Sequence, residues 1–122
     1  MRGGGSATYD QEEFAAELEG ARENPNIGTS LWFENDHVRV WEVRLEPGQR
    51  APFHSHHQTY FWTCIDPGKG FQRFPDGTAE AFDFGLGETV FNEIIAGDPM
   101  IHDLENTDDR LVRFVAVELK DL

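Results

Sequence analysis

Alternating polar and apolar residues dominate the chain from residue 31 onward, and this period of two predicts β-strands. The first example is the segment 31–49, in which Trp41, Val43 and Leu45 share one face of a half-buried strand that ends at a Pro47-Gly48 turn. Further strands are predicted from TYFWTCI, GFQRF, AEAFDFG, ETVFNEII, MIHDLEN and LVRFVAVEL, with Gly- and Pro-containing turns between most of them. Short strands at near-regular spacing predict an all-β sandwich or barrel.

The N-terminal part of the chain follows a different pattern. Residues 1–8 are Gly-rich and polar, and we predict a disordered tail there. Residues 9–30 predict a short helix and a linker, because Phe14 and Leu18 are one helical turn apart among good helix formers. The apolar stripe of this helix is thin, so we expect it to pack outside a single β-barrel domain over residues 31–122.

Composition is consistent with one domain that folds without disulfides. The chain has 122 residues, 39% of them hydrophobic, and ten are Phe. Cys64 is its single cysteine, which excludes a disulfide within the chain and fits a reducing compartment. No stretch has the apolar run of a signal peptide or of a membrane span, so we expect a soluble, cytoplasmic protein.

The net charge argues against two classes of partner. It is -13 at pH 7, and no basic stripe interrupts this acidity. Such a field repels nucleic acid and anionic membrane surfaces, so we expect neither as a partner. The simplest explanation of the negative charge is that it keeps the protein soluble.

The candidate chemistry lies in the stretch HSHHQTYFW, residues 54–62. His54 and His56 are two positions apart, so on a strand they point to the same side and can bind one divalent metal, whereas His57 points away. A third ligand must come from another strand. His102, which shares its face with apolar residues, is the candidate, and His37 is predicted to lie at the surface. Such a pattern also arises by chance, and a single histidine on an apolar face is more often a hydrogen-bonded core residue.

The wider sequence resembles the cupin superfamily of small jelly-roll β-barrels. The first cupin motif is a Gly, five residues, H-x-H, three or four residues, a Glu, six residues and a Gly. Here Gly48 is followed by QRAPF, His54-Ser55-His56 and HQT, while Tyr60 stands at the Glu position and Gly68 comes one place late.

The second cupin motif ends in a His, three residues and an Asn. This sequence has His102 and Asn106, preceded by AGDP, a rearranged form of the family's Pro-x-Gly. The resemblance covers about residues 31 to 120, and it implies a single-domain cupin, or monocupin, that binds a metal through His54, His56 and His102 and forms a homodimer.

Tyr60 is the main departure from the family pattern, in which three His and one Glu hold the metal. Without the Glu, three neutral imidazoles leave the charge of the ion uncompensated, which favours an anionic or enolisable bidentate substrate. Three-histidine iron sites occur in cupins that cleave β-diketones and in thiol dioxygenases. Tyr60 is predicted to donate a hydrogen bond to substrate or oxygen, or to be a fourth ligand if the metal lowers its phenol pKa.

Strand spacing also predicts the walls of a pocket. Trp62 and Cys64 follow Tyr60 at steps of two, so all three should share the interior face of their strand. Phe91 and Glu93 are also two positions apart, in ETVFNEII, and should share the interior face of that strand. The aromatic residues are equally explained by packing of the barrel interior. Cys64 is expected to be a small buried hydrophobic residue rather than a nucleophile.

Three functions remain open at this point. The leading one is a three-histidine Fe(II) dioxygenase acting on a small anionic or enolisable molecule. The second is a Zn-, Mn- or Ni-dependent isomerase or lyase, in which Tyr60 or Glu93 transfers a proton. The third is a small-molecule-binding cupin without catalysis, since this barrel carries many activities.

Overall fold

The structure is a computed structural model that describes residues 3–121. Its elements are β1 (Gly3–Thr8), a 3-10 turn (Gln11–Phe14), α1 (Ala15–Gly20), a second 3-10 turn (Ala21–Glu23), β2 (Ser30–Glu34), β3 (Val38–Leu45), β4 (Arg50–His56), β5 (Tyr60–Asp66), β6 (Gly68–Arg73), β7 (Thr78–Phe84), β8 (Thr89–Asn92), β9 (Met100–Asn106) and β10 (Val112–Leu119).

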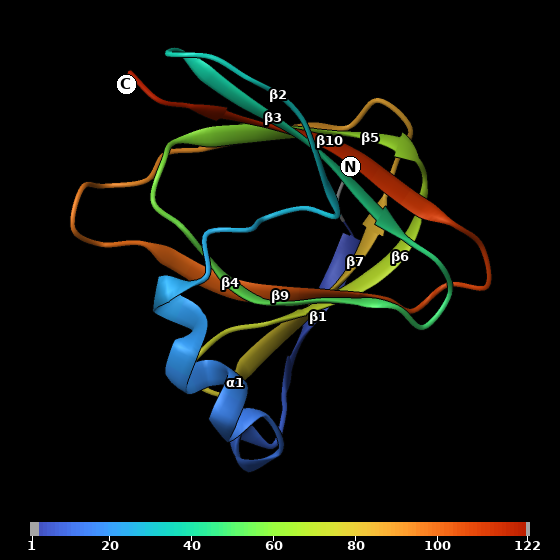
Figure 1. The fold of residues 1–122 in the computed structure, drawn as a ribbon. Coiled ribbons are helices and arrows are strands. Elements are labelled where there is room, and N and C mark those ends of the chain that lie inside the picture. The colour runs from blue at the N-terminus through green and yellow to red at the C-terminus, as the bar shows by residue number, and fades with distance from the viewer. Residues whose placement is uncertain (1–2, 122) are drawn as a thin grey trace.

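The strands form two antiparallel sheets of five strands each. Sheet I has the order β1-β7-β6-β9-β4, and sheet II has the order β2-β3-β10-β5-β8. The two sheets face each other, and α1 lies on the outer side of sheet I (Figure 1). The expected all-β architecture with a short N-terminal helix is confirmed.

The hydrophobic core lies between the two sheets. Trp41, Val43 and Leu45 of β3 are all buried in it, as their alternation predicts. Phe84 from β7 packs edge to face against Phe114 from β10, with ring centroids 4.8 Å apart, which ties sheet I to sheet II.

The segment 31–49 is two strands and a turn rather than one strand. The side chain of Asn35 accepts hydrogen bonds from the backbone N–H groups of His37 and Val38, at 2.8 and 2.9 Å, and so reverses the chain between β2 and β3. The predicted turn at Pro47-Gly48 is present, and Gly48 has a φ of 81°, a conformation that side chains disfavour.

The N-terminal residues differ from the disordered tail that we expected over 1–8. Gly3–Thr8 forms β1 and pairs antiparallel with β7 along its whole length, from Gly3 opposite Asp83 to Thr8 opposite Thr78. Strand pairing at a sheet edge depends on backbone hydrogen bonds, so a run without large apolar side chains can still add a strand. Residues 1 and 2 lie outside the described residues.

The helical segment packs outside the barrel, as expected. The ring of Phe14 contacts the ring of Phe53, with centroids 5.7 Å apart. Glu17 accepts hydrogen bonds from the Arg50 guanidinium at 2.6 and 2.8 Å and from the Phe53 backbone N–H at 2.8 Å. Arg50 also reaches the buried Asp103 at 2.9 Å. Among residues 3–121, no helix has the length and apolar character to cross a membrane.

Candidate metal centre

Strand β4 turns two of its histidines toward the interior because it contains a β-bulge. The pairing of β4 with β9 shifts by one residue just before His54, which lies opposite His102. Pro52 stands in the shifted interval, where a residue without an N–H group is tolerated. The extra residue resets the alternation, so Phe53 packs toward the helical segment while His54 and His56 face the space between the sheets.

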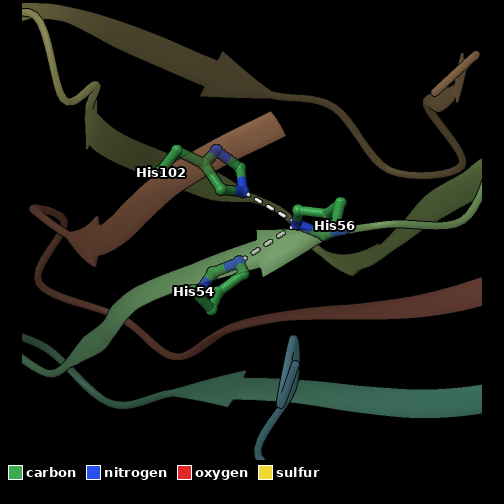
Figure 2. Close-up of side chains that lie close together, drawn as sticks. All are labelled: His54, His56 and His102. Carbon is green, nitrogen blue, oxygen red and sulfur yellow. Dashed lines mark hydrogen bonds between the residues drawn. The ribbon is translucent and has the colours of Figure 1, made fainter. Parts of the chain in front are cut away.

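Three imidazoles converge at this point. The His56 Nε2 atom lies 3.1 Å from the Nε2 of His54 and 3.1 Å from the Nε2 of His102 (Figure 2). The candidate ligand atoms of the three residues all lie within 4.8 Å of one another. His54 and His56 are each 3% exposed, and His102 is half-buried. The register of β4 and β9 therefore brings together the three histidines that the sequence singled out.

Hydrogen bonds at the far side of two rings fix their tautomers. His54 Nδ1 lies 2.7 Å from the carbonyl oxygen of Pro52, which can only accept, so Nδ1 carries the proton. His102 Nδ1 donates in the same way to Gln72 Oε1 at 2.6 Å. Both Nε2 atoms consequently present lone pairs to the centre of the cluster, which is the arrangement of metal-binding histidines with an outer acceptor.

Burial keeps the three imidazoles in their neutral form. It lowers the pKa of His54, and it lowers the pKa of His102 well below the ordinary value of 6.5. The pKa of His56 is also well below that value, first because of burial and then because its histidine neighbours would repel a second positive charge. Neutral imidazoles have the free lone pair that a metal ion requires.

The donor set fits a divalent metal ion. Two nitrogens that are each about 2.1 Å from one ion lie about 3.0–3.4 Å apart when their angle at the ion is about 90–109°. The spacings from His56 Nε2 to the Nε2 atoms of His54 and His102 are both 3.1 Å, within that range. Without an ion, the lone pairs of His54 and His102 compete for one N–H of His56. Among residues 3–121, His56 Nδ1 has no hydrogen-bond partner, so this ring has no outer acceptor of its own.

Tyr60, at the position of the usual cupin Glu, stacks on His56. The two ring centroids are 4.0 Å apart and the planes are nearly parallel, at 11°. Tyr60 is 3% exposed and forms part of the wall beside the histidines. The stack fixes the plane of His56, the one imidazole of the three whose outer nitrogen lacks a partner among the described residues.

The histidines open into a cavity of about 290 Å³ between the sheets. Trp62 is one of the residues that line this cavity. Its other walls are Ile27, Val43, Ala51, Gln72, Phe74, Glu80, Phe82, Phe84, Asn92, Met100, Leu104, Phe114 and Ala116, together with Tyr60 and the three histidines. The volume suits a small organic molecule.

The predicted interior position of Phe91 is wrong, because β8 turns its other face to the interior, and Glu93 lies just beyond the end of β8. In the pairing of β8 with β5, Tyr60 lies opposite Asn92 and Trp62 lies opposite Val90. Residues opposite each other in a ladder point to the same face, so Asn92 faces the interior and Phe91 does not. Phe91 is 59% exposed, and Glu93 is an exposed residue of the loop that follows β8.

Cys64 shares the interior side but does not line the cavity. It is 1% exposed within the hydrophobic core, and burial raises the pKa of its thiol to about 11. The residue is therefore a buried thiol in the core, as its expected character implied, and its predicted place in the pocket wall is corrected.

Three polar residues of the cavity were not identified from the sequence. Gln72 orients His102, and Glu80 lies directly opposite Gln72 on β7. Asn92 is the third. In the segment TAEAFDF, the alternation of a β-strand places Glu80 on the same face as Phe82 and Phe84, so the sequence alone indicates its position.

The remaining histidines lie outside the cluster. His57 is exposed, and its Nε2 lies 3.0 Å from Ser55 Oγ on the outer side of the barrel, as the strand alternation predicts. His37 is exposed and pairs with Asp121 at 2.7 Å.

Comparisons with known proteins identify the fold. No family model matches the sequence, and no curated protein matches it. A cupin domain from Bordetella pertussis matches in structure with a TM-score of 0.67 and 23% identity, over 80% of this chain and 96% of that one. An uncharacterised conserved protein with a double-stranded β-helix domain from Klebsiella pneumoniae gives a TM-score of 0.60 and 21% identity, over 84% and 86% of the two chains.

A third solved structure also matches the fold. An RmlC-like cupin family protein from Methanocaldococcus jannaschii gives a TM-score of 0.56 at 16% identity, over 76% of this chain and 91% of that one. At such low identity the likeness is one of fold. The match covers nearly all of the Bordetella and Methanocaldococcus chains, so the shared unit is a whole small domain.

Proposed function

We propose that this chain, a small protein with the cupin fold, is a metal-dependent enzyme acting on a small molecule, and that its reaction is Fe(II)-dependent dioxygenation. The observation that supports the proposal is the clustering of the side-chain nitrogens of His54, His56 and His102, within 4.8 Å of one another, at the wall of a cavity. When bound there, a divalent ion with open coordination positions supplies Lewis acidity, and Fe(II) also supplies electrons for O2 chemistry.

The protein residues have separate tasks in this proposal. The carbonyl of Pro52 and the side chain of Gln72 hold His54 and His102 with their Nε2 lone pairs inward. Tyr60 keeps His56 in plane by stacking. The apolar walls around Trp62 exclude water, which strengthens polar interactions with a bound substrate.

The ligand set also bears on substrate choice. Three neutral nitrogens leave the charge of the ion uncompensated, so an oxygen-containing anion or an enolate is the preferred chelating group. The Tyr60 phenol is proposed to donate a hydrogen bond to that group. A homodimer remains part of the proposal.

A second candidate is a Zn-, Mn- or Ni-dependent isomerase or lyase, and Glu80 favours it. This carboxyl group is among the lining residues of the cavity, so it can meet a substrate proton there, whereas Glu93 is not among them. A binding protein without catalysis is the outcome if no metal form turns over any substrate.

Oxygen uptake distinguishes these candidates. The protein is loaded anaerobically with Fe(II), and in parallel with Zn, Mn or Ni, and is mixed with acetylacetone and with small thiol carboxylates. Dioxygenation predicts O2 consumption in proportion to product in the Fe(II) form alone. Product formation without O2 consumption, in the Zn, Mn or Ni form, would assign the second function.

A further inference from the structure

The cavity wall away from the histidines carries negative charge and no positive charge. In the described part of the chain, none of its lining residues is a Lys or an Arg. The nearest arginines along sheet I, Arg50 and Arg73, belong to the outer face, where each is paired with Asp103 at 2.9 Å. A second anionic group on a ligand would therefore find no cationic partner among these lining residues.

Glu80 is the carboxylate on this wall. Its strand β7 pairs with β6, and Glu80 lies opposite Gln72, whose side chain contacts His102. Glu80 is exposed, which places it toward the mouth of the cavity. Within residues 3–121, it has no ion-pair partner. A carboxylate that lines a ligand cavity and has no ion-pair partner among these residues is available to pair with a charge on the ligand.

Aromatic rings border the same region. Phe82 lies two residues beyond Glu80 on the same face of β7, and Phe74 lies near His102, with ring centroids 6.3 Å apart. Both rings line the cavity together with Trp62. Aromatic faces attract alkylated ammonium groups, which are weakly hydrated and enter apolar cavities more readily than a primary amine.

We infer that the substrate of this site is a small zwitterion, whose oxygen-bearing anionic end chelates the metal and whose alkylated ammonium end lies between Glu80 and the aromatic wall. The inference rests on the proposed metal site, which receives the anionic end. Strands β9 and β7 are separated only by β6, so the columns that contain His102 and Glu80 are about 10 Å apart. After allowing for the reach of both side chains, a chain of a few carbons between the two charged ends fits this distance.

Two probes of the same shape test the charge preference. They are 4-(trimethylammonio)butanoate and 5,5-dimethylhexanoate, which differ only in whether the branched centre is a cationic nitrogen or a neutral carbon. Binding of each is measured by calorimetry to the Ni²⁺-loaded and to the metal-free protein. The variants are Glu80→Gln and, as the matched control, Asp83→Asn, which removes one negative charge from the exposed outer face of the same strand.

We expect the wild-type protein to bind the ammonium probe about tenfold more tightly than the neutral probe. Glu80→Gln should reduce this ratio to about twofold, the contribution of the aromatic wall, and Asp83→Asn should leave it unchanged. Equal affinities in the wild type, an unchanged ratio in Glu80→Gln, or no binding of the ammonium probe to either form would each overturn the inference.

The two metal states separate this inference from the proposed function. If Ni²⁺ tightens both probes but the charge preference is absent, the metal site stands and the inference is wrong. If the charge preference depends on Glu80 but Ni²⁺ changes neither affinity, the cationic subsite stands and the proposed metal function is wrong.

Discussion

Replacing Gln72 by Leu removes the acceptor of the His102 Nδ1–H group with little change of volume. When a metal occupies Nε2, the proton must stay on Nδ1, and without Gln72 that N–H is left unpaired at the edge of the apolar cavity. In the metal-free protein the ring can rotate or change tautomer, so most of the cost falls on the metal-bound state. An unpaired buried N–H costs about 1–3 kcal/mol, and loss of an outer acceptor typically weakens metal binding by about 10–100-fold.

The assay is competition for Zn²⁺ against a chelator of known affinity. Gln72→Leu should weaken Zn²⁺ binding by about 10–100-fold, while Gln72→Glu, which keeps an acceptor at this position, should bind at least as tightly as the wild type. Thermal unfolding of the metal-free proteins controls for damage to the fold. Wild-type affinity in a folded Gln72→Leu protein would refute the role assigned to the 2.6 Å hydrogen bond.

Three further predictions concern Glu17, Tyr60 and the net charge of the chain. Hydrogen bonds from Arg50 lower the pKa of Glu17 below its ordinary value of 4.5, so the ionised carboxylate stabilises the fold above that value and the stabilisation is lost as pH falls through the lowered pKa. Glu17→Gln should therefore lower the free energy of unfolding by about 1–3 kcal/mol at neutral pH, with the difference from wild type disappearing in acid when both are unfolded in urea. Tyr60→Phe should keep the metal and lower turnover by about 10²–10³ if the phenol donates to the reacting group, whereas loss of metal in that variant would make Tyr60 a ligand. The net charge of -13 predicts no mobility shift of DNA or RNA even at low salt, and a shift that weakens steeply with salt would contradict this.

The cluster of three histidines was largely predictable from the sequence because its residues obey local rules. His54 and His56 point the same way on one strand, and the resemblance of the His102–Asn106 segment to the second cupin motif implies that His102 lies beside them. The bulge at Pro52 could not be predicted from the sequence. It does not change the relative direction of His54 and His56, because both residues lie on the same side of the bulge along the strand. Likewise, the burial of Trp41 follows from the alternation within β3.

The predictions that failed concern strands whose position depends on pairing with a neighbouring strand. The direction of Phe91 is decided by the register of β8 against β5, and a sequence gives no count of residues across that pairing. The strand at Gly3–Thr8 depends on an open backbone edge of β7, which its own residues do not encode. The interior position of Glu80, by contrast, follows from its alternation with Phe82 and Phe84 within β7.

The metal content of three variants tests the central claim most directly. Wild-type protein, His102→Ala and His57→Ala are purified without added metal, incubated with equal Fe(II) or Zn²⁺, desalted and measured by elemental analysis. The shared site predicts about one ion per chain in the wild type and in His57→Ala, whose ring lies outside the cluster, and loss of most metal in His102→Ala. Full metal occupancy in a folded His102→Ala protein would contradict the three-histidine site.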